Sequence, residues 1–280
     1  MVRTSSANCP LWSVYLQLRK QDLPNAVDPG DSITQGASDQ SMGFGMAAEL
    51  QAAYVRRFDV INRGYSGYNT NHAVDIITRA LPTPEQASMK FLTIWFGAND
   101  ANKNPTQGQY VPPALFKSNL LAIINHQAVK VHSPNIILIT PPPFEESLLV
   151  ELQKLWGATG ETRKAKDAQE YAEIVKQVGK EAGVPVVDAW SLCMEKAGWK
   201  EGSDQILPGG DAGVRSAVLA DLLHDGLHLS PSGYKIVFDG LIDLMKEHWP
   251  EFPPYKMPFT EKVPWEIELG DQMWDVNNDK

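Results

Sequence analysis

Short apolar runs, separated by longer segments of mixed polarity, dominate the middle of the chain. Four of them are rich in β-branched or aromatic residues and too short for helices. They predict strands that are buried on both faces, as in a parallel sheet. These runs are 58–61 (FDVI), 91–96 (FLTIWF), 136–139 (IILI) and 184–187 (VPVV).

The segments between these runs carry helical patterns. Residues 45–57 are mostly helix formers, and 114–131 follow a pair of prolines and place apolar side chains at helical spacing. A charged helix with one apolar stripe is predicted over 162–182 and would end at Gly183, and a last helix over 230–249 opens on a Ser-Pro pair. This alternation predicts an α/β fold with a parallel sheet covered on both faces.

Beyond residue 250 the helical pattern stops. Several prolines and the aromatic residues Trp265 and Trp274 predict an extended tail that packs on the domain. The chain has 280 residues, a length that fits one large domain.

Composition narrows the function classes. The net charge is −9 and no block of Lys or Arg offsets it, so nucleic-acid binding is not supported. Cys9 and Cys193 are too few and too far apart for a disulfide framework or a cysteine metal site, which favours a reducing, cytoplasmic location. No apolar run approaches the roughly 18 residues of a transmembrane helix.

Two short motifs become informative when they are taken together. Gly30-Asp31-Ser32 alone is a weak signal, and so is a lone Asp225 three residues before His228. A serine hydroxyl, however, needs a neutral imidazole to accept its proton, and a carboxylate that fixes the imidazole tautomer improves that base. The pair therefore suggests nucleophilic catalysis by a serine.

Two further motifs directly follow predicted strands. NRGYSGYNT contains Gly67, whose backbone N–H is left unshielded, and FGANDAN contains Asn99, whose side-chain amide is a hydrogen-bond donor. Open parallel sheets build their sites at the carboxyl ends of their strands, where these groups are expected to meet. Asp31 and Asp100 are expected to hold the local turns through backbone hydrogen bonds.

The four blocks GDSITQG, NRGYSGYNT, FGANDAN and DGLHLSPSGYKI, in this order, resemble the SGNH (GDSL-type) hydrolase superfamily. They are most similar to the branch typified by the isoamyl acetate-hydrolysing esterases of fungi, over about residues 30–265. The resemblance implies a three-layer α/β/α, flavodoxin-like fold with a central parallel sheet and neither metal nor organic cofactor. It makes Ser32 the nucleophile, His228 the general base and Asp225 the residue that orients it. It also implies an oxyanion hole formed by the backbone N–H groups of Ser32 and Gly67 and the side-chain amide of Asn99.

The sequence departs from that superfamily just before the serine. A central strand should stand there, but residues 23–29 read LPNAVDP, and proline and aspartate suit a central strand poorly. The first strand is therefore predicted to be atypical or missing. Three explanations stay open: a short strand at 25–28, a substitute strand at 12–18, or an N-terminus that does not belong to the functional product.

These considerations divide the chain into three parts. Residues 1–29 form an atypical N-terminal segment that is a candidate for disorder, residues 30–249 form a hydrolase domain, and residues 250–280 form a proline-rich tail.

The leading function is a serine esterase that hydrolyses small carboxylic esters, with short acyl groups such as acetate, through an acyl-enzyme. The alternatives are an impaired paralogue or a splice or gene-model variant, and an acyltransferase, thioesterase or lysophospholipase that uses the same site. The expected partner is a small-molecule ester, and the oligomeric state stays open, a homodimer included.

Overall fold

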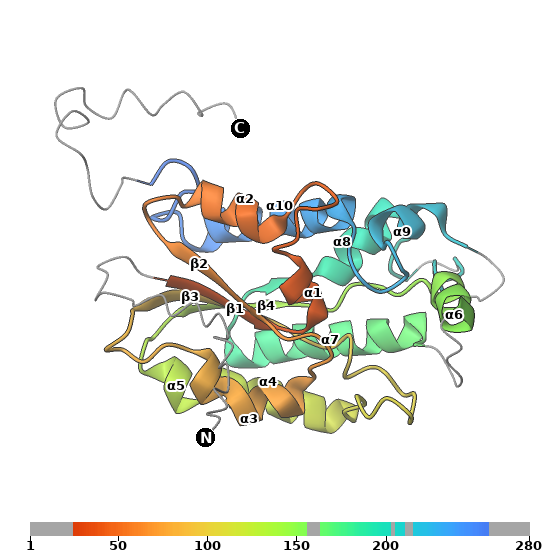
Figure 1. Ribbon diagram of the computed structural model, residues 1–280, viewed down its shortest axis with the longest axis horizontal. Helices are drawn as coiled ribbons and strands as arrows, with labels where there is room; N and C mark the ends of the chain where they lie inside the picture. The colour runs from red at the N-terminus through yellow and green to blue at the C-terminus, as the bar shows by residue number, and fades with distance from the viewer. Residues whose placement is uncertain (1–24, 156–162, 203–204, 211–214, 258–280) are drawn as a thin grey trace, which may run out of the picture.

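The computed structural model describes residues 25–155, 163–202, 205–210 and 215–257 (Figure 1). Within them, five parallel strands form one sheet in the order β2-β1-β3-β4-β5. This order reverses direction between β1 and β3, and ligands of open parallel sheets bind where the order reverses. The strands are β1 (Asn25–Gly30), β2 (Asp59–Gly64), β3 (Met89–Trp95), β4 (Asn135–Ile139) and β5 (Val186–Val187).

Helices cover both faces of the sheet, which confirms the predicted three-layer α/β/α fold (Figure 1). One face carries α2 (Met46–Ala53), α8 (Ala189–Lys196) and α10 (Pro231–His248). The other carries α3 (Thr70–Ala80), α4 (Pro113–Ile124), α5 (Gln127–Lys130) and α7 (Ala165–Ala182). The remaining helices of the described residues are α1 (Ser32–Gly36), α6 (Glu146–Leu155) and α9 (Ala217–Leu222).

The helical predictions agree with the structure in part. The helix predicted over 114–131 is broken, because α4 ends at Ile124 and His126 then caps α5 by accepting a hydrogen bond from the N–H of Ala128 at 3.1 Å. Helix α3 was not predicted, although its Asn69 N-cap is a typical start signal. The predicted end of α7 is correct, since Gly183 lies in the left-handed region with φ 67°.

The first strand is present and atypical. β1 lies between β2 and β3, and its whole length pairs with β2. The ladder to β3 pairs Asn25, Ala26, Val27 and Gly30 but skips Asp28 and Pro29, so the missing N–H of Pro29 falls in a gap of that ladder. Of the three explanations, the structure therefore confirms the short strand at 25–28, which continues to Gly30. The substitute strand at 12–18 lies outside the described residues.

Asp28 also finds a partner inside the sheet. The hydroxyl of Thr93 on β3 donates to its carboxylate at 2.6 Å, which satisfies one acceptor where the ladder is interrupted. Burial raises the pKa of Asp28 to about 6, and the Thr93 hydrogen bond counteracts part of that rise. The strand thus tolerates an acidic residue because its neighbour supplies a donor.

The first residues after α10 pack on the domain. The Tyr54 hydroxyl donates to the carbonyl of Phe252 at 3.0 Å, and the N–H of Tyr255 donates to the carbonyl of Ala53 at 2.7 Å. The Phe252 ring also contacts Phe58 at a centroid distance of 5.8 Å. Residues 258–280 and 1–24, on which the other terminal predictions fall, lie outside the described residues. Among the helices that are described, none has the length and apolar character to cross a bilayer.

Candidate active site

Ser32 is presented by a tight turn between β1 and α1. Asp31 is the N-cap of α1 and accepts the N–H of Ile33 at 2.8 Å. Burial raises the pKa of Asp31 to about 7, although the Ile33 hydrogen bond acts against the rise. A Cβ on Gly30 would lie 1.8 Å from the Thr34 hydroxyl, so only glycine permits this turn. Asp31 therefore holds the turn, as its position next to Ser32 suggested.

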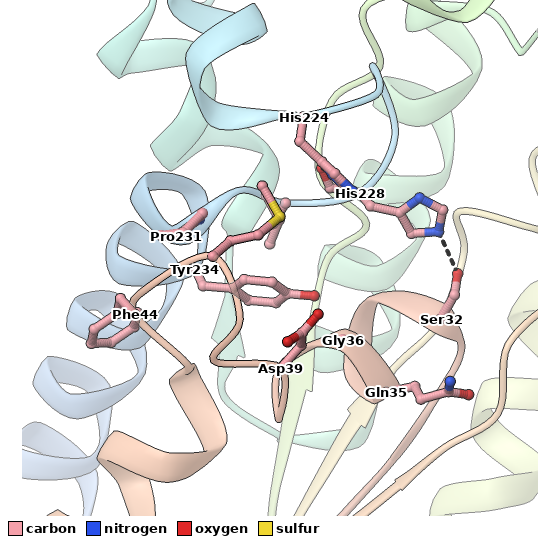
Figure 2. A pocket seen from close by; sticks show the side chains of 11 residues that line it. Ser32, Gln35, Gly36, Asp39, Phe44, His224, His228, Pro231 and Tyr234 are labelled. Atoms are coloured by element: carbon pink, nitrogen blue, oxygen red, sulfur yellow. Dashed lines mark hydrogen bonds between the residues drawn. The ribbon is translucent and has the colours of Figure 1, made fainter. Parts of the chain in front are cut away.

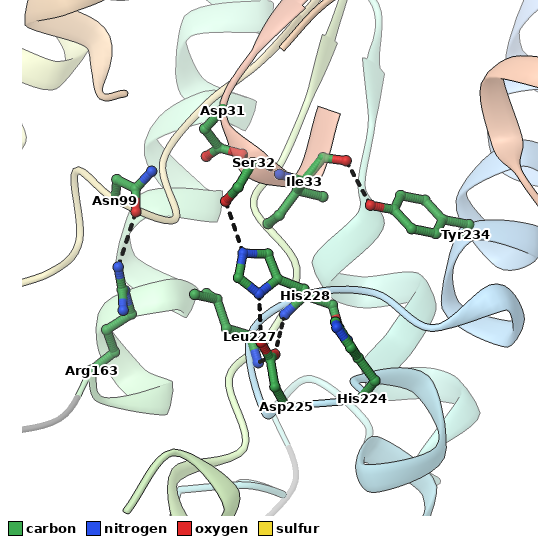
Figure 3. A network of polar contacts seen from close by, with 10 residues as sticks. All are labelled: Asp31, Ser32, Ile33, Asn99, Arg163, His224, Asp225, Leu227, His228 and Tyr234. Atoms are coloured by element: carbon green, nitrogen blue, oxygen red, sulfur yellow. Dashed lines mark hydrogen bonds and ion pairs between the residues drawn. The ribbon is translucent and has the colours of Figure 1, made fainter. Parts of the chain in front are cut away.

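The structure brings Ser32, His228 and Asp225 into one hydrogen-bonded chain (Figure 3). Nε2 of His228 lies 2.9 Å from Oγ of Ser32, and Nδ1 of the same ring lies 2.6 Å from Oδ2 of Asp225. Ser32 comes from the end of β1, whereas the other two come from the loop before α10. With a proton on Nδ1, Nε2 is left free to accept the proton of the serine hydroxyl.

The loop that carries Asp225 orients its own carboxylate. Oδ1 accepts the backbone N–H groups of Leu227 at 2.9 Å and His228 at 2.7 Å, which leaves Oδ2 for the imidazole. Burial acts to raise the pKa of Asp225, but the hydrogen bond and charge of His228 and the two backbone donors outweigh it and bring the pKa to about 2. The carboxylate therefore remains ionised at neutral pH.

Gly67 lies in the loop after β2, next to the serine turn. The N–H of Tyr65 donates to the carbonyl of Gly30 at 2.9 Å, and the N–H of Ser66 donates to the side chain of Gln35 on α1 at 2.9 Å. Gly67 has φ 82°, a conformation that favours glycine. Within the described part of the chain, the N–H groups of Gly67 and Ser32 have no hydrogen-bond acceptor, so both are free to bind an oxyanion.

Asn99 follows β3 and contacts the loop of Gly67. Its Nδ2 donates to the carbonyl of Tyr68 at 2.9 Å, which uses one of its two amide protons. The next residue, Asp100, accepts the N–H and the hydroxyl of Thr70 at 2.9 Å and 2.5 Å and so ties the two loops together. The structure therefore places Asn99 beside the Tyr68–Asn69 peptide, with one amide proton that has no acceptor among the described residues.

Two side chains of this region were not predicted from the sequence. Nη2 of Arg163 donates to Oδ1 of Asn99 at 2.9 Å (Figure 3). The same atom donates to Oε1 of Gln109 at 2.9 Å, and Nε donates to the carbonyl of Ala98 at 3.2 Å. Gln109 in turn donates from Nε2 to the carbonyl of Gly67 at 3.2 Å. Both residues lie in polar loops with no periodic pattern, and only their long-range contacts reveal them.

The other histidines near the site have structural contacts. His72 accepts the N–H of Asn69 and completes the cap of α3. His224, Asp225 and His228 have ligand atoms within 4.8 Å of one another, the one such group among the described residues that could hold a metal ion. Asp225 and His228 already bind each other, and His228 also contacts Ser32, so these two serve the hydrogen-bonded chain.

A small pocket opens beside Ser32 (Figure 2). Its volume is about 210 Å³, below the range of roughly 300–1,000 Å³ that is typical of sites for drug-sized ligands. The pocket lies on the side of His228, and its wall combines apolar and polar side chains. Its lining residues include Gln35, Asp39, Met42, Phe44, His224, Pro231 and Tyr234.

The fold is shared with solved hydrolase structures. The crystal structure of a lipase/acylhydrolase from Enterococcus faecalis superimposes with a TM-score of 0.55 and 22% sequence identity, over 80% of this chain and 96% of that chain. This likeness places the chain among α/β proteins with the SGNH hydrolase fold.

Sequence similarity defines the family. Residues 30–236 match the model of the GDSL-like lipase/acylhydrolase family. The isoamyl acetate-hydrolyzing esterase 1 homolog of Bos taurus is 35% identical over 248 residues, which are 86% of this chain and 90% of that protein. A GDSL esterase/lipase of Arabidopsis thaliana is 33% identical over 244 residues, 84% of this chain and 90% of that protein. The chain therefore belongs to the GDSL-like lipase/acylhydrolase family and is a carboxylic ester hydrolase.

Proposed function

We propose that the protein is a serine esterase that hydrolyses acetate and other short-chain esters of small alcohols through an acyl-enzyme on Ser32. The hydrogen-bonded chain from Ser32 through His228 to Asp225, with contacts of 2.9 Å and 2.6 Å, is the observation that carries this proposal. It provides a nucleophile, a base and a group that orients the base within one site.

The proposed reaction has two steps. In the first, Oγ of Ser32 attacks the ester carbonyl carbon while Nε2 of His228 takes its proton. The carbon–oxygen bond to the alcohol then breaks, and His228 returns the proton to the departing oxygen. In the second step, His228 takes a proton from water, which attacks the acyl carbon, and Ser32 regains its proton as the acid leaves. Gly67, Asn99 and the N–H of Ser32 would bind the oxyanion in both steps.

The pocket supports a small and uncharged alcohol group. Because His228 must protonate the departing oxygen, the alcohol leaves on the side of His228, where the pocket of about 210 Å³ lies. The carboxylate of Asp39 lines this pocket and would repel a phosphate. We therefore expect a neutral ester to be a better substrate than a lysophospholipid. The names of the relatives, isoamyl acetate-hydrolyzing esterases, agree with this choice. The cytoplasmic location is part of the same proposal, because the buried thiol of Cys193 suits a reducing compartment.

Labelling with a fluorophosphonate probe tests the role of Ser32. The wild-type protein should react at one site and lose its esterase activity, and Ser32→Ala should do neither. A cooperatively melting wild-type protein that fails to react would refute the nucleophile assignment and favour an impaired paralogue.

Product analysis tests the substrate class. Acetate release from isoamyl acetate should exceed acid release from long-chain, thioester and lysophospholipid substrates. Added alcohol separates hydrolysis from acyl transfer: an acyltransferase would form a new ester at the expense of free acid, whereas the proposed hydrolase would release the same amount of acid.

A further inference from the structure

We propose that Arg163 is a positioning residue, which fixes the orientation of the Asn99 side-chain amide so that this amide donates to the oxyanion. This inference rests on the proposed function, because it assigns a role within the same site. Arg163 precedes α7 and reaches the loop after β3 from a distant part of the chain.

The contacts of Asn99 leave one favourable orientation of its amide. Its oxygen accepts from the guanidinium of Arg163 and its nitrogen donates to the carbonyl of Tyr68, both at 2.9 Å. A flipped amide would place its NH₂ donors against a guanidinium, which can only donate, and its oxygen against a carbonyl, which can only accept. Figure 3 shows the amide oxygen facing Arg163. Without Arg163, one of these two constraints is lost, and a flipped amide would turn an acceptor toward the oxyanion.

The positive charge of Arg163 also favours hydrogen-bond donation by the Asn99 amide. Its hydrogen-bond acceptors among the described residues are neutral oxygens, those of Ala98, Asn99 and Gln109, while the carboxylates of Asp31 and Asp225 act on it through their charge. Burial lowers the pKa of the guanidinium to about 10 against the opposing charges of Asp31 and Asp225, so Arg163 stays positive at neutral pH. A cation bound to the amide oxygen polarises the amide and strengthens the N–H on its other end.

Gln109 extends the arrangement to the second proposed donor. Its Oε1 accepts from Arg163 at 2.9 Å and from Asn102 at 2.8 Å, while its Nε2 donates to the carbonyl of Gly67 at 3.2 Å. The guanidinium thus contacts Asn99 directly and Gly67 through one side chain. Its planar fork suits this task, because two or more acceptors in fixed directions are held at once.

A double-mutant cycle with Asn99 tests the proposal. Arg163→Met should lower kcat on p-nitrophenyl acetate by about 10- to 100-fold, part of the loss expected for a whole oxyanion donor, and change KM by less than about threefold. In the Asn99→Ala background the same substitution should lower kcat by less than about threefold, because the amide that it positions is absent. Effects that multiply in the double variant would refute the inference.

Two further variants guard against a trivial loss of activity. Arg79→Met makes the same change on the exposed last turn of α3 and should leave kcat within twofold. If Arg163→Met does not fold, Arg163→Lys replaces it in the cycle. Lysine keeps the charge but lacks the fork, so a loss of about three- to tenfold is expected that also disappears in the Asn99→Ala background.

The failure of this inference can be told from the failure of the proposed function. Wild-type turnover that Ser32→Ala does not abolish would refute the proposed function. In that case an NMR measurement decides the inference. The side-chain amide resonance of Asn99 is identified as the one that disappears in the Asn99→Ala variant. A clear shift or broadening in Arg163→Met, but not in Arg79→Met, supports the positioning role, and an unchanged resonance refutes it.

Discussion

The two halves of the candidate site are held by different kinds of contact. In the triad half, which holds the proposed catalytic triad of Ser32, Asp225 and His228, the last two lie three residues apart in one loop whose backbone N–H groups bind the carboxylate. In the oxyanion half, which holds the proposed oxyanion donors Gly67 and Asn99 together with Gln109 and Arg163, the residues come from three loops, because Asn99 and Gln109 share the connection between β3 and α4. They meet through hydrogen bonds of the Asn99, Gln109 and Arg163 side chains. The Asp225–His228 pair of the triad half is therefore built by local geometry, and its contact with Ser32 is long-range. In the oxyanion half, all the contacts among Gly67, Asn99, Gln109 and Arg163 are long-range.

This difference predicts how each half responds to substitution. A local loop such as 225–228 places its groups whenever the loop forms, so the loss of one group should remove its chemistry and leave the others in place. In a network that joins three loops, several side chains hold each group in place. The loss of one positioning side chain should therefore lower activity only in part, and its effect should depend on the other side chains.

The largest effect is expected in the triad half. Asp225→Asn keeps the shape of the side chain but removes the charge and favours the wrong imidazole tautomer, so kcat should fall by about 10⁴-fold. Kinetics on p-nitrophenyl acetate measures this loss. Asp221→Asn, the same change at an exposed position of α9, should retain activity within twofold. A loss below tenfold for Asp225→Asn would mean that Asp225 does not orient His228.

The next effect belongs to the oxyanion half. Asn99→Ala removes one donor and should lower kcat by about 10²- to 10³-fold with little change in KM, because the oxyanion exists only in the transition states and intermediates. Asn125→Ala, at the end of α4, is the matched control with activity expected near that of the wild type. A rise in KM at constant kcat would instead assign Asn99 to ground-state binding.

The same difference explains what the sequence could predict. The spacing of Asp225 and His228 before a capped helix is readable in a short window, and so is the turn of Gly30 to Ser32. Arg163 and Gln109 are separated by 54 positions and belong to no periodic pattern, so no local signal links them. Their contact follows from the packing of α7 against α4, which only the assembled fold determines.

A smaller effect is expected for Gln109, because it acts on the donors only through Gly67 and Arg163. Gln109→Met leaves the Gly67 carbonyl without its donor and Arg163 without one acceptor. We expect kcat to fall by about three- to tenfold. This loss is smaller than that of an oxyanion donor because Gln109 contacts the proposed donors and not the oxyanion itself. Gln177→Met makes the same change at an exposed position of α7 and is the control. A loss as large as that of Asn99→Ala would show that the loop itself had rearranged.

The strands that carry the two halves differ as well. β3, which leads to Asn99, is apolar and buried along nearly its whole length, and its strand pattern is plain in the sequence. β1, which leads to Ser32, contains Asp28 and Pro29, and propensity alone argued against it. Pairing with β2 along its whole length and the hydroxyl of Thr93 compensate for both residues. Tertiary contacts therefore decided a strand that local preference could not.

Asp28 should make the stability of β1 depend on pH. Its pKa is about 6 in the folded protein against 3.8 for an unperturbed carboxyl, so between about pH 4 and 6 the folded state holds a proton that the unfolded state has released. The contribution of Asp28 to the free energy of unfolding therefore falls as pH rises through this window. Above pH 6 the loss is complete, because the folded protein then contains the desolvated charge.

Asp28→Asn removes this charge while its amide oxygen can still accept from Thr93. At pH 8 the substitution should raise the free energy of unfolding by roughly 1–2 kcal/mol. A shift of one pKa unit corresponds to about 1.4 kcal/mol, and the expected gain is smaller than the whole shift of Asp28 would give because its side chain is only partly buried. Below pH 4 the difference should vanish, since both states are then protonated. Urea unfolding at pH 8 and pH 3.5 measures it, with the exposed Asp243→Asn of α10 as the control. A destabilised Asp28→Asn at pH 8 would mean that the charged carboxylate itself stabilises the central strand, and the tolerance of β1 for Asp28 would need another physical cause.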